Sequence, residues 1–156
     1  MISRLILTFI VAFVTTSPVT EIITGKVIHI ADGDTLVIMH GYDEIKVRLY
    51  EIDTPELDQP YGIEAKQALY DLAFNKIVTV TIETIDDYGR VVGKVFVRDL
   101  DVNAELIKGG HAWVFRRYAK NKDLYELERT AREKQLGLWA LPEDQRMPPW
   151  KWRHRK

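Results

Sequence analysis

Three short segments of the sequence combine acidic, arginine and tyrosine side chains at spacings that could support chemistry. They are Asp32–Thr35 (DGDT), Arg48–Glu56 (RLYEIDTPE) and Asp86–Arg90 (DDYGR). Taken singly, the first and third also fit plain hairpin turns, and the second fits a strand that ends at a proline turn. Together they place several carboxylates and two arginines in one short chain. That combination suits a site for a cation and an anionic substrate.

These residue types meet the demands of phosphodiester hydrolysis, which needs positive charge on the phosphoryl oxygens. Clustered carboxylates repel one another, so their presence argues for a bound cation. Asp34 and Asp53 would give a hard ion such as Ca²⁺ two oxygen ligands and leave positions for water and substrate. Arg48 and Arg90 stay charged at any working pH and offer a planar fork that matches phosphoryl oxygens. Glu56 follows across a proline turn, close enough to address a metal-bound water.

The elements that must position these side chains predict an α+β domain, a five-stranded OB-fold β-barrel with about three helices. Asp32-Gly33 is a strong hairpin signal between the first two β-rich runs. In the third run apolar residues alternate with Lys46 and Arg48, which aims Arg48 away from the apolar face. The predicted strands cover 22–31, 35–40, 44–50, 77–85 and 91–97, and the predicted helices cover 60–74, 102–109 and 121–136.

The chain of 156 residues has the length of one ordinary domain. We find no repeat and no linker, and we expect one domain over residues 21–141 followed by a Trp- and Pro-rich basic tail over 142–156. The absence of cysteine excludes disulfides, thiolate metal sites and thiol catalysis.

The first twenty residues have the pattern of a signal peptide. Arg4 is their only charge and precedes the apolar run Leu5–Val14, which as a helix would span about 15 Å, half of a hydrocarbon core. A small or polar exit follows at Thr15–Ser17. We therefore expect residues 1–20 to be a signal peptide and the protein to be secreted or periplasmic. There is no A-x-A cleavage motif and Pro18 disfavours a nearby cut, so an uncleaved membrane anchor or a core element are the alternatives.

Charge is distributed unevenly along the chain. The net charge of −1 by itself argues against a general polyanion binder. Residues 31–64 contain nine carboxylates and two cations, whereas 108–122 contains five cations and no acid, and 146–156 contains five more cations. An acidic region beside two basic segments suits a protein that holds a cation and meets phosphates. For the basic segments alone, solvated surface charge is the simpler explanation.

Together, the three segments resemble the staphylococcal nuclease (thermonuclease) family. The pattern runs Asp-Gly-Asp-Thr, then Arg-x4-Asp-Thr-Pro-Glu, then Asp-x-Tyr-Gly-Arg. Further matches are Tyr61-Gly62 with Glu64-Ala65, Asn103 with Leu106, and Gly137-Leu138-Trp139. The resemblance covers residues 25–139. It implies an OB-fold hydrolase, a calcium-dependent nuclease that cleaves DNA and RNA and leaves 3′-phosphate ends.

The resemblance also implies a cation site and a general base. Asp34 and Asp53 correspond to the carboxylates that hold one Ca²⁺, and the backbone carbonyl of Thr54 completes the protein ligands. Glu56 matches the glutamate that acts as general base or orients the attacking water. Asp32 stands where the family has an acid near the metal-bound waters.

Contacts with the substrate follow from the same resemblance. Arg48 and Arg90 match the two arginines on the scissile phosphate, and Tyr88 matches a tyrosine beside the terminal phosphate of the nucleotide. Tyr118 corresponds to a second tyrosine, while Arg116 stands where another tyrosine would pack the base. The residue before Tyr88 is acidic in this chain where the family has a lysine, which puts that phosphate contact in doubt.

Two other function classes are alternatives. An OB-fold can bind single-stranded nucleic acid without chemistry, and Trp113, Tyr118, Arg116 and Arg117 would serve such a module. A simple binder has no use for several acids beside its groove, because they repel the ligand, and this favours an enzyme. A protein-interaction domain is supported only by the Trp/Pro tail. We expect DNA and RNA substrates, no stable protein partner, no membrane contact in the mature form, and a monomer.

Overall fold

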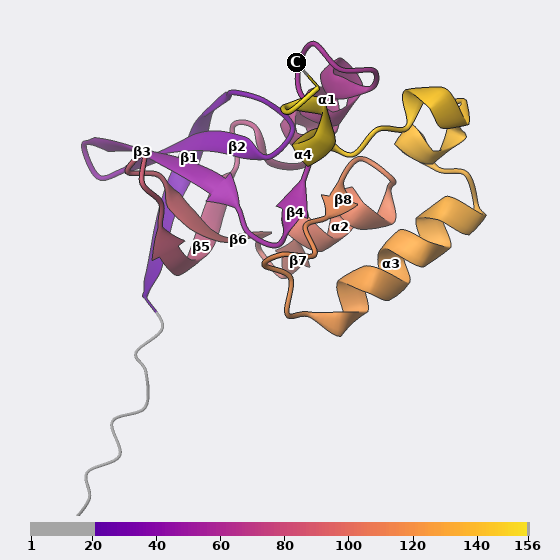
Figure 1. The fold of residues 1–156 in the computed structure, drawn as a ribbon. Helices are drawn as coiled ribbons and strands as arrows, with labels where there is room; N and C mark the ends of the chain where they lie inside the picture. The colour runs from indigo at the N-terminus through magenta and orange to yellow at the C-terminus, as the bar shows by residue number, and fades with distance from the viewer. Residues whose placement is uncertain (1–20, 156) are drawn as a thin grey trace, which may run out of the picture.

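A closed β-barrel forms the centre of the computed structural model, which describes residues 21–155 (Figure 1). Its strands are β1 (Ile22–Ile30), β2 (Thr35–His40), β3 (Asp43–Leu49), β5 (Ile77–Ile85) and β6 (Val91–Val97). They lie in the order β3-β2-β1-β5-β6 with antiparallel neighbours, and a parallel pairing of β3 with β6 closes the ring. The predicted five-stranded barrel is confirmed, and each strand ends within one residue of its predicted position.

Alternate side chains of the strands fill the barrel, because successive residues of a strand point to opposite faces. A bulge between Val27 and His29 bends β1, which pairs with β2 on one side and with β5 on the other. The strands also approach closely at Gly93, where a Cβ atom would stand 2.5 Å from the carbonyl oxygen of Thr81. The barrel core comprises Val27, Ile30, Leu36, Ile38, Val47, Leu49, Val78, Val80, Val91 and Val95.

Three longer helices pack beside the barrel: α1 (Gly62–Ala73), α2 (Val102–Lys108) and α3 (Lys122–Glu133). The side chain of Asp101 caps α2, and that of Asn121 caps α3. All three were predicted, although α1 begins two residues later and α3 ends three residues earlier than expected. Tyr61 before α1 and Gln135 after α3 adopt positive φ angles of 73° and 52°, which lie outside the helical region.

Several short elements were not predicted from the sequence. The strands β4 (Ile52–Asp53) and β8 (Trp113–Val114) pair with each other, and β7 (Leu100–Asp101) extends the sheet beyond β6. The chain then ends with η1 (Gly137–Ala140), η2 (Glu143–Gln145) and α4 (Pro149–Trp152).

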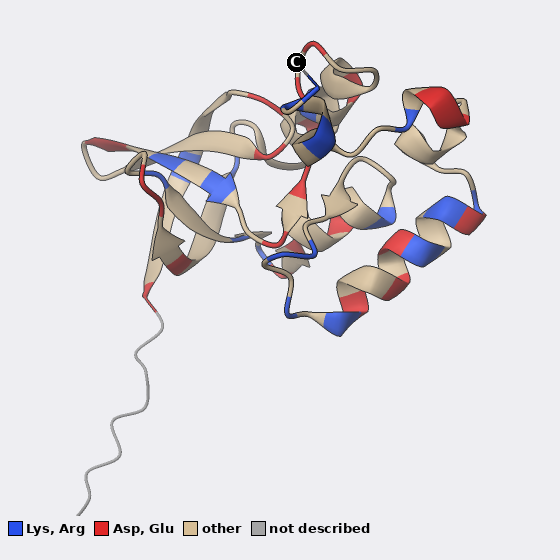
Figure 2. Cartoon of the chain, viewed as in Figure 1, with Lys and Arg blue, Asp and Glu red and all other residues tan. Residues whose placement is uncertain are grey.

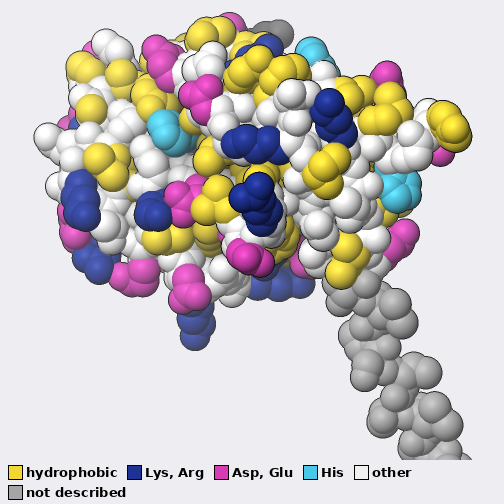
Figure 3. All heavy atoms as spheres, turned by 180° about the vertical axis from the view of Figure 1, so that it is seen from behind, with side chains coloured by type: hydrophobic (Ala, Val, Ile, Leu, Met, Phe, Trp, Pro, Cys, Tyr) yellow, Lys and Arg dark blue, Asp and Glu magenta, His cyan; other side chains and the backbone are white. Residues whose placement is uncertain are grey.

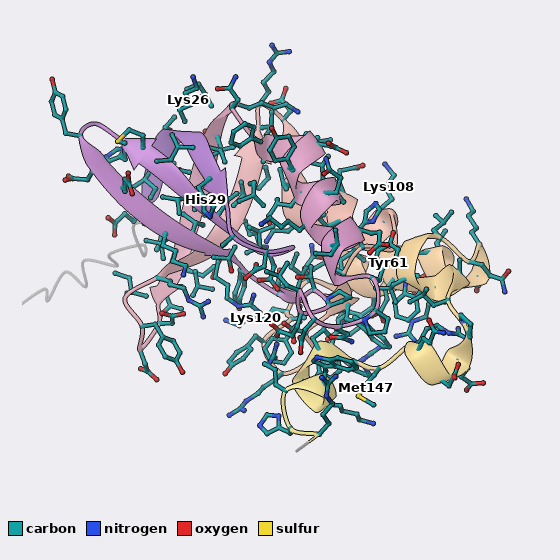
Figure 4. All side chains as sticks on the ribbon, turned by 90° about the horizontal axis from the view of Figure 1, so that it is seen from above. Lys26, His29, Tyr61, Lys108, Lys120 and Met147 are labelled. Atoms are coloured by element: carbon teal, nitrogen blue, oxygen red, sulfur yellow. The ribbon has the colours of Figure 1, made fainter. Side chains whose placement is uncertain are left out.

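The end of the chain folds back to the middle of the molecule, where α4 lies across one side of it (Figure 1). Trp150 in α4 packs its ring 5.9 Å from Trp113 and 5.6 Å from Phe115, measured between centroids. Met147, labelled in Figure 4, accepts a hydrogen bond from Gln59 Nε2 at its carbonyl oxygen. Residues 146–155, which we call the C-terminal segment, are therefore part of the packed domain.

None of the helices within residues 21–155 is long and apolar enough to cross a membrane. The predicted signal peptide, residues 1–20, lies outside the described part of the chain. On the face seen in Figure 3, basic and acidic side chains are intermixed. The acidic and basic segments of the sequence therefore do not produce a surface patch of a single charge on that face.

Candidate active site

A cavity of about 570 Å³ lies at the end of the barrel where β2 begins, β3 ends and the turn between β5 and β6 approaches. All three segments singled out in the sequence contribute to its wall. The predicted site residues that line it are Asp32, Asp34, Arg48, Thr54, Glu56, Tyr88, Arg90 and Tyr118. The sequence motifs, which are up to 58 residues apart between Asp32 and Arg90, therefore meet in one place.

Arg48 joins the two acids that were predicted to hold a cation. Its Nη1 forms an ion pair with Asp34 Oδ1, and its Nη2 lies 3.0 Å from Asp53 Oδ1. Asp34 and Asp53 are almost fully buried, with 4% and 1% of their surface exposed. The second oxygen of Asp34 accepts the backbone N–H of Thr54 at 3.0 Å. These contacts link the first motif to the second.

The folding of the backbone explains this arrangement. Arg48 pairs with Thr35 across the β2–β3 ladder, so it stands beside Asp34. Asp53 is held in β4 by pairing with Trp113 of β8. Gly33 allows the first turn to pack on Thr54, since a Cβ atom at Gly33 would lie only 2.6 Å from Thr54 Oγ1.

The electrostatics of the site distinguish its acids. Burial alone would raise the pKa of Asp34, but the charge and hydrogen bonds of Arg48 and the hydrogen bond from Thr54 hold that pKa below its usual value. Burial raises the pKa of Asp53 and the charge of Asp34 raises it further, although arginine partners oppose the shift. Burial, followed by the charge of Asp34, raises the pKa of Asp32 to about 6. Asp32 therefore protonates more readily than Asp34.

Arg90 is oriented by its own turn. Its Nε donates to Asp86 Oδ2 at 2.7 Å, while Asp86 Oδ1 accepts the backbone N–H groups of Tyr88 and Arg90, each at 3.0 Å. The guanidinium also lies over the Tyr88 ring, 5.5 Å from its centroid. Asp86 therefore organises the whole turn, a role that the sequence motif alone did not reveal.

Glu56 faces an arginine that the sequence analysis did not include in the site. Arg153 of the C-terminal segment donates from Nη1 to Glu56 Oε1 at 2.6 Å and from Nη2 to Asp53 Oδ2 at 2.8 Å. Figure 2 shows basic residues of the C-terminal segment beside acidic residues near β4. The basic tail gave no spacing that would connect Arg153 to the motifs, because the contact with Asp53 spans 100 residues.

The backbone around Glu56 is fixed by the short loop that follows it. Gln59 Oε1 accepts the backbone N–H of Glu56 at 3.1 Å. Gly62 packs its α-carbon against the carbonyl group of Glu56 so closely that any Cβ atom would overlap it. The Tyr61-Gly62 match noted in the sequence therefore has a local physical reason.

The donor set fits a hard cation with few protein ligands. Asp34 and Asp53 present carboxylate oxygens within reach of the same guanidinium, and Thr54 is bound directly to Asp34. Calcium takes such oxygen ligands and accepts water at its other positions. Over residues 21–155 no group of three or more His, Cys, Asp or Glu side chains is arranged to hold a metal ion. The predicted site is smaller than such a group, since it uses two carboxylates and a carbonyl.

The predicted substrate contacts divide into two groups. Tyr88 and Tyr118 lie on the wall of the cavity and are 87% and 49% exposed, so their rings are open to a ligand. Arg116 is placed elsewhere: its Nη2 pairs with the buried Glu128 at 3.0 Å and its guanidinium covers the Tyr125 ring. Arg116 does not line the cavity, so the structure does not join it to the other predicted site residues.

Glu51 is a further site residue that sequence reasoning missed. It lines the cavity although it is nearly fully buried, and its Oε1 accepts the backbone N–H groups of Lys120 and Asn121 at 2.6 Å and 2.9 Å. Its other oxygen pairs with Lys94 at 3.3 Å. Glu51 thereby fixes the loop that carries Tyr118. The only sequence signal for it was an acidic residue among apolar neighbours at the end of the third predicted strand.

Comparison with known proteins agrees with this geometry. Residues 46–141 match the family described as "Staphylococcal nuclease homologue". The chain is 41% identical to a micrococcal nuclease of Shigella flexneri, with 83% of this chain and 79% of that protein covered. It is 38% identical to an uncharacterised endonuclease of Escherichia coli (86% and 87% covered) and 37% identical to the staphylococcal-like nuclease CAN1 of Arabidopsis thaliana (72% and 34% covered). The chain therefore belongs to the staphylococcal nuclease family.

Proposed function

We propose that this protein is a calcium-dependent nuclease that hydrolyses phosphodiester bonds in DNA and RNA and leaves 3′-phosphate ends. The observation that carries the proposal is that Arg48, which lines the same cavity as Asp34, Arg90 and Glu56, also pairs with the buried Asp53 behind the cavity wall. The nuclease names of the relatives support the substrate class.

Each side chain has a task in such a reaction. A calcium ion held by Asp34, Asp53 and the carbonyl of Thr54 would supply positive charge to the phosphoryl group. Arg48 and Arg90 would bind phosphoryl oxygens, whose negative charge grows in the transition state. Glu56 would accept the proton of the water that attacks phosphorus. The bond from phosphorus to the 5′ oxygen then breaks, and that oxygen takes a proton from solvent, which leaves the phosphate on the 3′ side.

A direct test is an assay of the purified chain on heat-denatured DNA and on RNA. We expect cleavage with calcium and none after a calcium chelator is added, because only oxygen ligands are available at the site. Full cleavage in chelator, or rescue by zinc alone, would contradict the metal assignment. End-labelling of the products would test the 3′-phosphate.

The second candidate function is binding of single strands without hydrolysis. It is favoured by the exposed rings of Tyr88 and Tyr118 on the cavity wall, because bases stack on such rings. The same assay separates the two functions. A pure binder would retain labelled oligonucleotide in the presence of calcium without shortening it.

A further inference from the structure

Arg153 contacts two of the three carboxylates on which the proposed reaction depends, Asp53 and Glu56. Its Nη2 lies 2.8 Å from Asp53 Oδ2, and its Nη1 lies 3.2 Å from Asp53 Oδ1 and 2.6 Å from Glu56 Oε1. With Arg48 on Asp53 Oδ1 as well, both oxygens of Asp53 accept hydrogen bonds from guanidinium groups. A cation that takes Asp53 as a ligand must compete with these bonds.

The C-terminal segment is built to deliver this side chain. Trp150 is packed against Trp113 and Phe115, and Trp152 Nε1 donates to Asp58 Oδ1 at 3.0 Å in the loop after Glu56. Arg153 itself is only partly buried, with 38% of its side chain exposed. The backbone just before Arg153 is thus anchored at two tryptophans, while the guanidinium retains room to move toward solvent.

We propose that Arg153 sets the cation affinity of the active site: it acts as an internal counter-ion that holds Asp53 and Glu56 until a divalent cation displaces it. The inference rests on the proposed function only in taking Asp53 as a cation ligand. A guanidinium and a calcium ion that share one carboxylate repel each other strongly at such short range. The C-terminal segment therefore raises the calcium concentration at which the site fills.

This role differs from those of the two motif arginines. Arg48 is tied to β3 and bridges Asp34 to Asp53, and Arg90 is tied to Asp86 within its own turn. Arg153 contacts Glu56, lies outside residues 46–141 that match the family, and comes from the end of the chain. Its withdrawal would free Oδ2 of Asp53, a predicted cation ligand, and Oε1 of Glu56, the proposed base.

The test measures calcium binding in the absence of substrate, by isothermal titration calorimetry on the full chain. Arg153→Gln is compared with wild type and with Lys151→Gln, which removes the same charge from an exposed position in α4. We expect Arg153→Gln to bind calcium at least about tenfold more tightly, equal to about 1.4 kcal/mol, and Lys151→Gln to match wild type within about twofold. Arg153→Lys should lie between them, since an ammonium cannot form the paired contacts.

Each other outcome has a distinct meaning. Equal affinities in Arg153→Gln and Lys151→Gln, with wild type binding calcium, would overturn the inference and leave the proposed function intact. Weaker binding in Arg153→Gln would show that Arg153 supports the ligand set, and would also overturn the inference. If no chain bound calcium, the calcium assignment would fall and the inference with it. Circular dichroism of each variant checks that the fold is retained.

Discussion

Arg48 contacts both predicted cation ligands, Asp34 through Nη1 and Asp53 through Nη2. The planar, forked guanidinium makes this possible because its two terminal nitrogens can bind separate carboxylates. We expect Arg48→Lys to lower kcat by about 10²–10³, because an ammonium cannot reach both carboxylates and a phosphoryl oxygen. Lys46→Arg, on an exposed position of the same strand, is the matched control and should retain wild-type turnover. Near-equal rates for the two variants, with intact circular dichroism, would remove Arg48 from the catalytic set.

Gly33 shows how a residue without a side chain shapes the site. It does not adopt a positive φ, so alanine suits its backbone and any loss in Gly33→Ala comes from the contact with Thr54. Because the added Cβ would lie 2.6 Å from Thr54 Oγ1, we expect a destabilisation of about 1–3 kcal/mol and weaker calcium binding. Urea unfolding and calorimetry measure these effects. A variant with unchanged stability and affinity would show that the turn adjusts freely.

Single residues were predictable where the motif is local. Asp34, Arg48, Asp53 and Glu56 lie within 23 positions of sequence, and the structure brings them together as the spacing indicated. Arg153 was not predictable in this way. It reaches Asp53 through tertiary packing of Trp150, and nothing in the spacing of basic residues in the tail encodes that contact.

The turn between β5 and β6 is an element with its own internal support. Asp86 accepts three hydrogen bonds from the turn, one of them from the Arg90 side chain. We expect Asp86→Ala to lower kcat/KM by about tenfold or more, because Arg90 loses the partner that aims it. Asp87→Ala provides the control in the same turn, since Asp87 is exposed and its loss removes a charge that repels phosphate. Equal losses in both variants would argue against a specific role for Asp86.

The loop before α3 depends on one buried acid. Burial works against ionised Glu51, but hydrogen bonds from Asn121 and Lys120 and the charge of Lys94 hold its pKa below the usual value. Its ionised form therefore stabilises the fold above the ordinary glutamate pKa, and this stability is lost as pH falls through the lowered pKa. We expect Glu51→Gln to cost about 1–3 kcal/mol at neutral pH, and the gap from wild type to shrink below about pH 4.

Thermal unfolding of both proteins from pH 3 to pH 8 measures this dependence. A gap that stayed constant over the whole range would mean that the charge of Glu51 does not contribute. If Glu51→Gln lost stability but kept the KM of wild type, Glu51 would support the fold without positioning Tyr118 for substrate.

Elements were predictable in proportion to their length. The five barrel strands each have enough alternating residues to define a face, and each ended within one residue of its predicted position. The pair β4–β8 and the helix α4 have two to four residues each, too few for any period to show. They form because tertiary partners hold them, and the sequence of the segment alone does not contain that information.

For the whole molecule, the charged start and short apolar run before residue 21 suggest export. We propose that the protein is secreted or periplasmic, where millimolar calcium would fill a site with two carboxylates. Fractionation of expressing cells and sequencing of the mature N-terminus measure this. We expect a chain that begins near residue 21 outside the cytosol. A cytosolic protein that still begins at Met1 would contradict export, and a membrane-bound one would indicate an uncleaved anchor.

The parallel seam between β3 and β6 has a consequence for how activity appears during folding. It pairs Val47 with Val91 and Arg48 with Val92, so its closure joins segments 44 residues apart and carries Arg90 to the cavity of Arg48. Contacts of such separation form slowly, because the entropy of loop closure is lost before they are gained. An intermediate in which the hairpins had formed but β3 and β6 were still unpaired would have secondary structure, but Arg90 would not yet lie beside Arg48 to bind phosphate. Recovery of the proposed nuclease activity after dilution from denaturant would therefore report closure of the barrel, which requires this seam and also the pairing of β1 with β5.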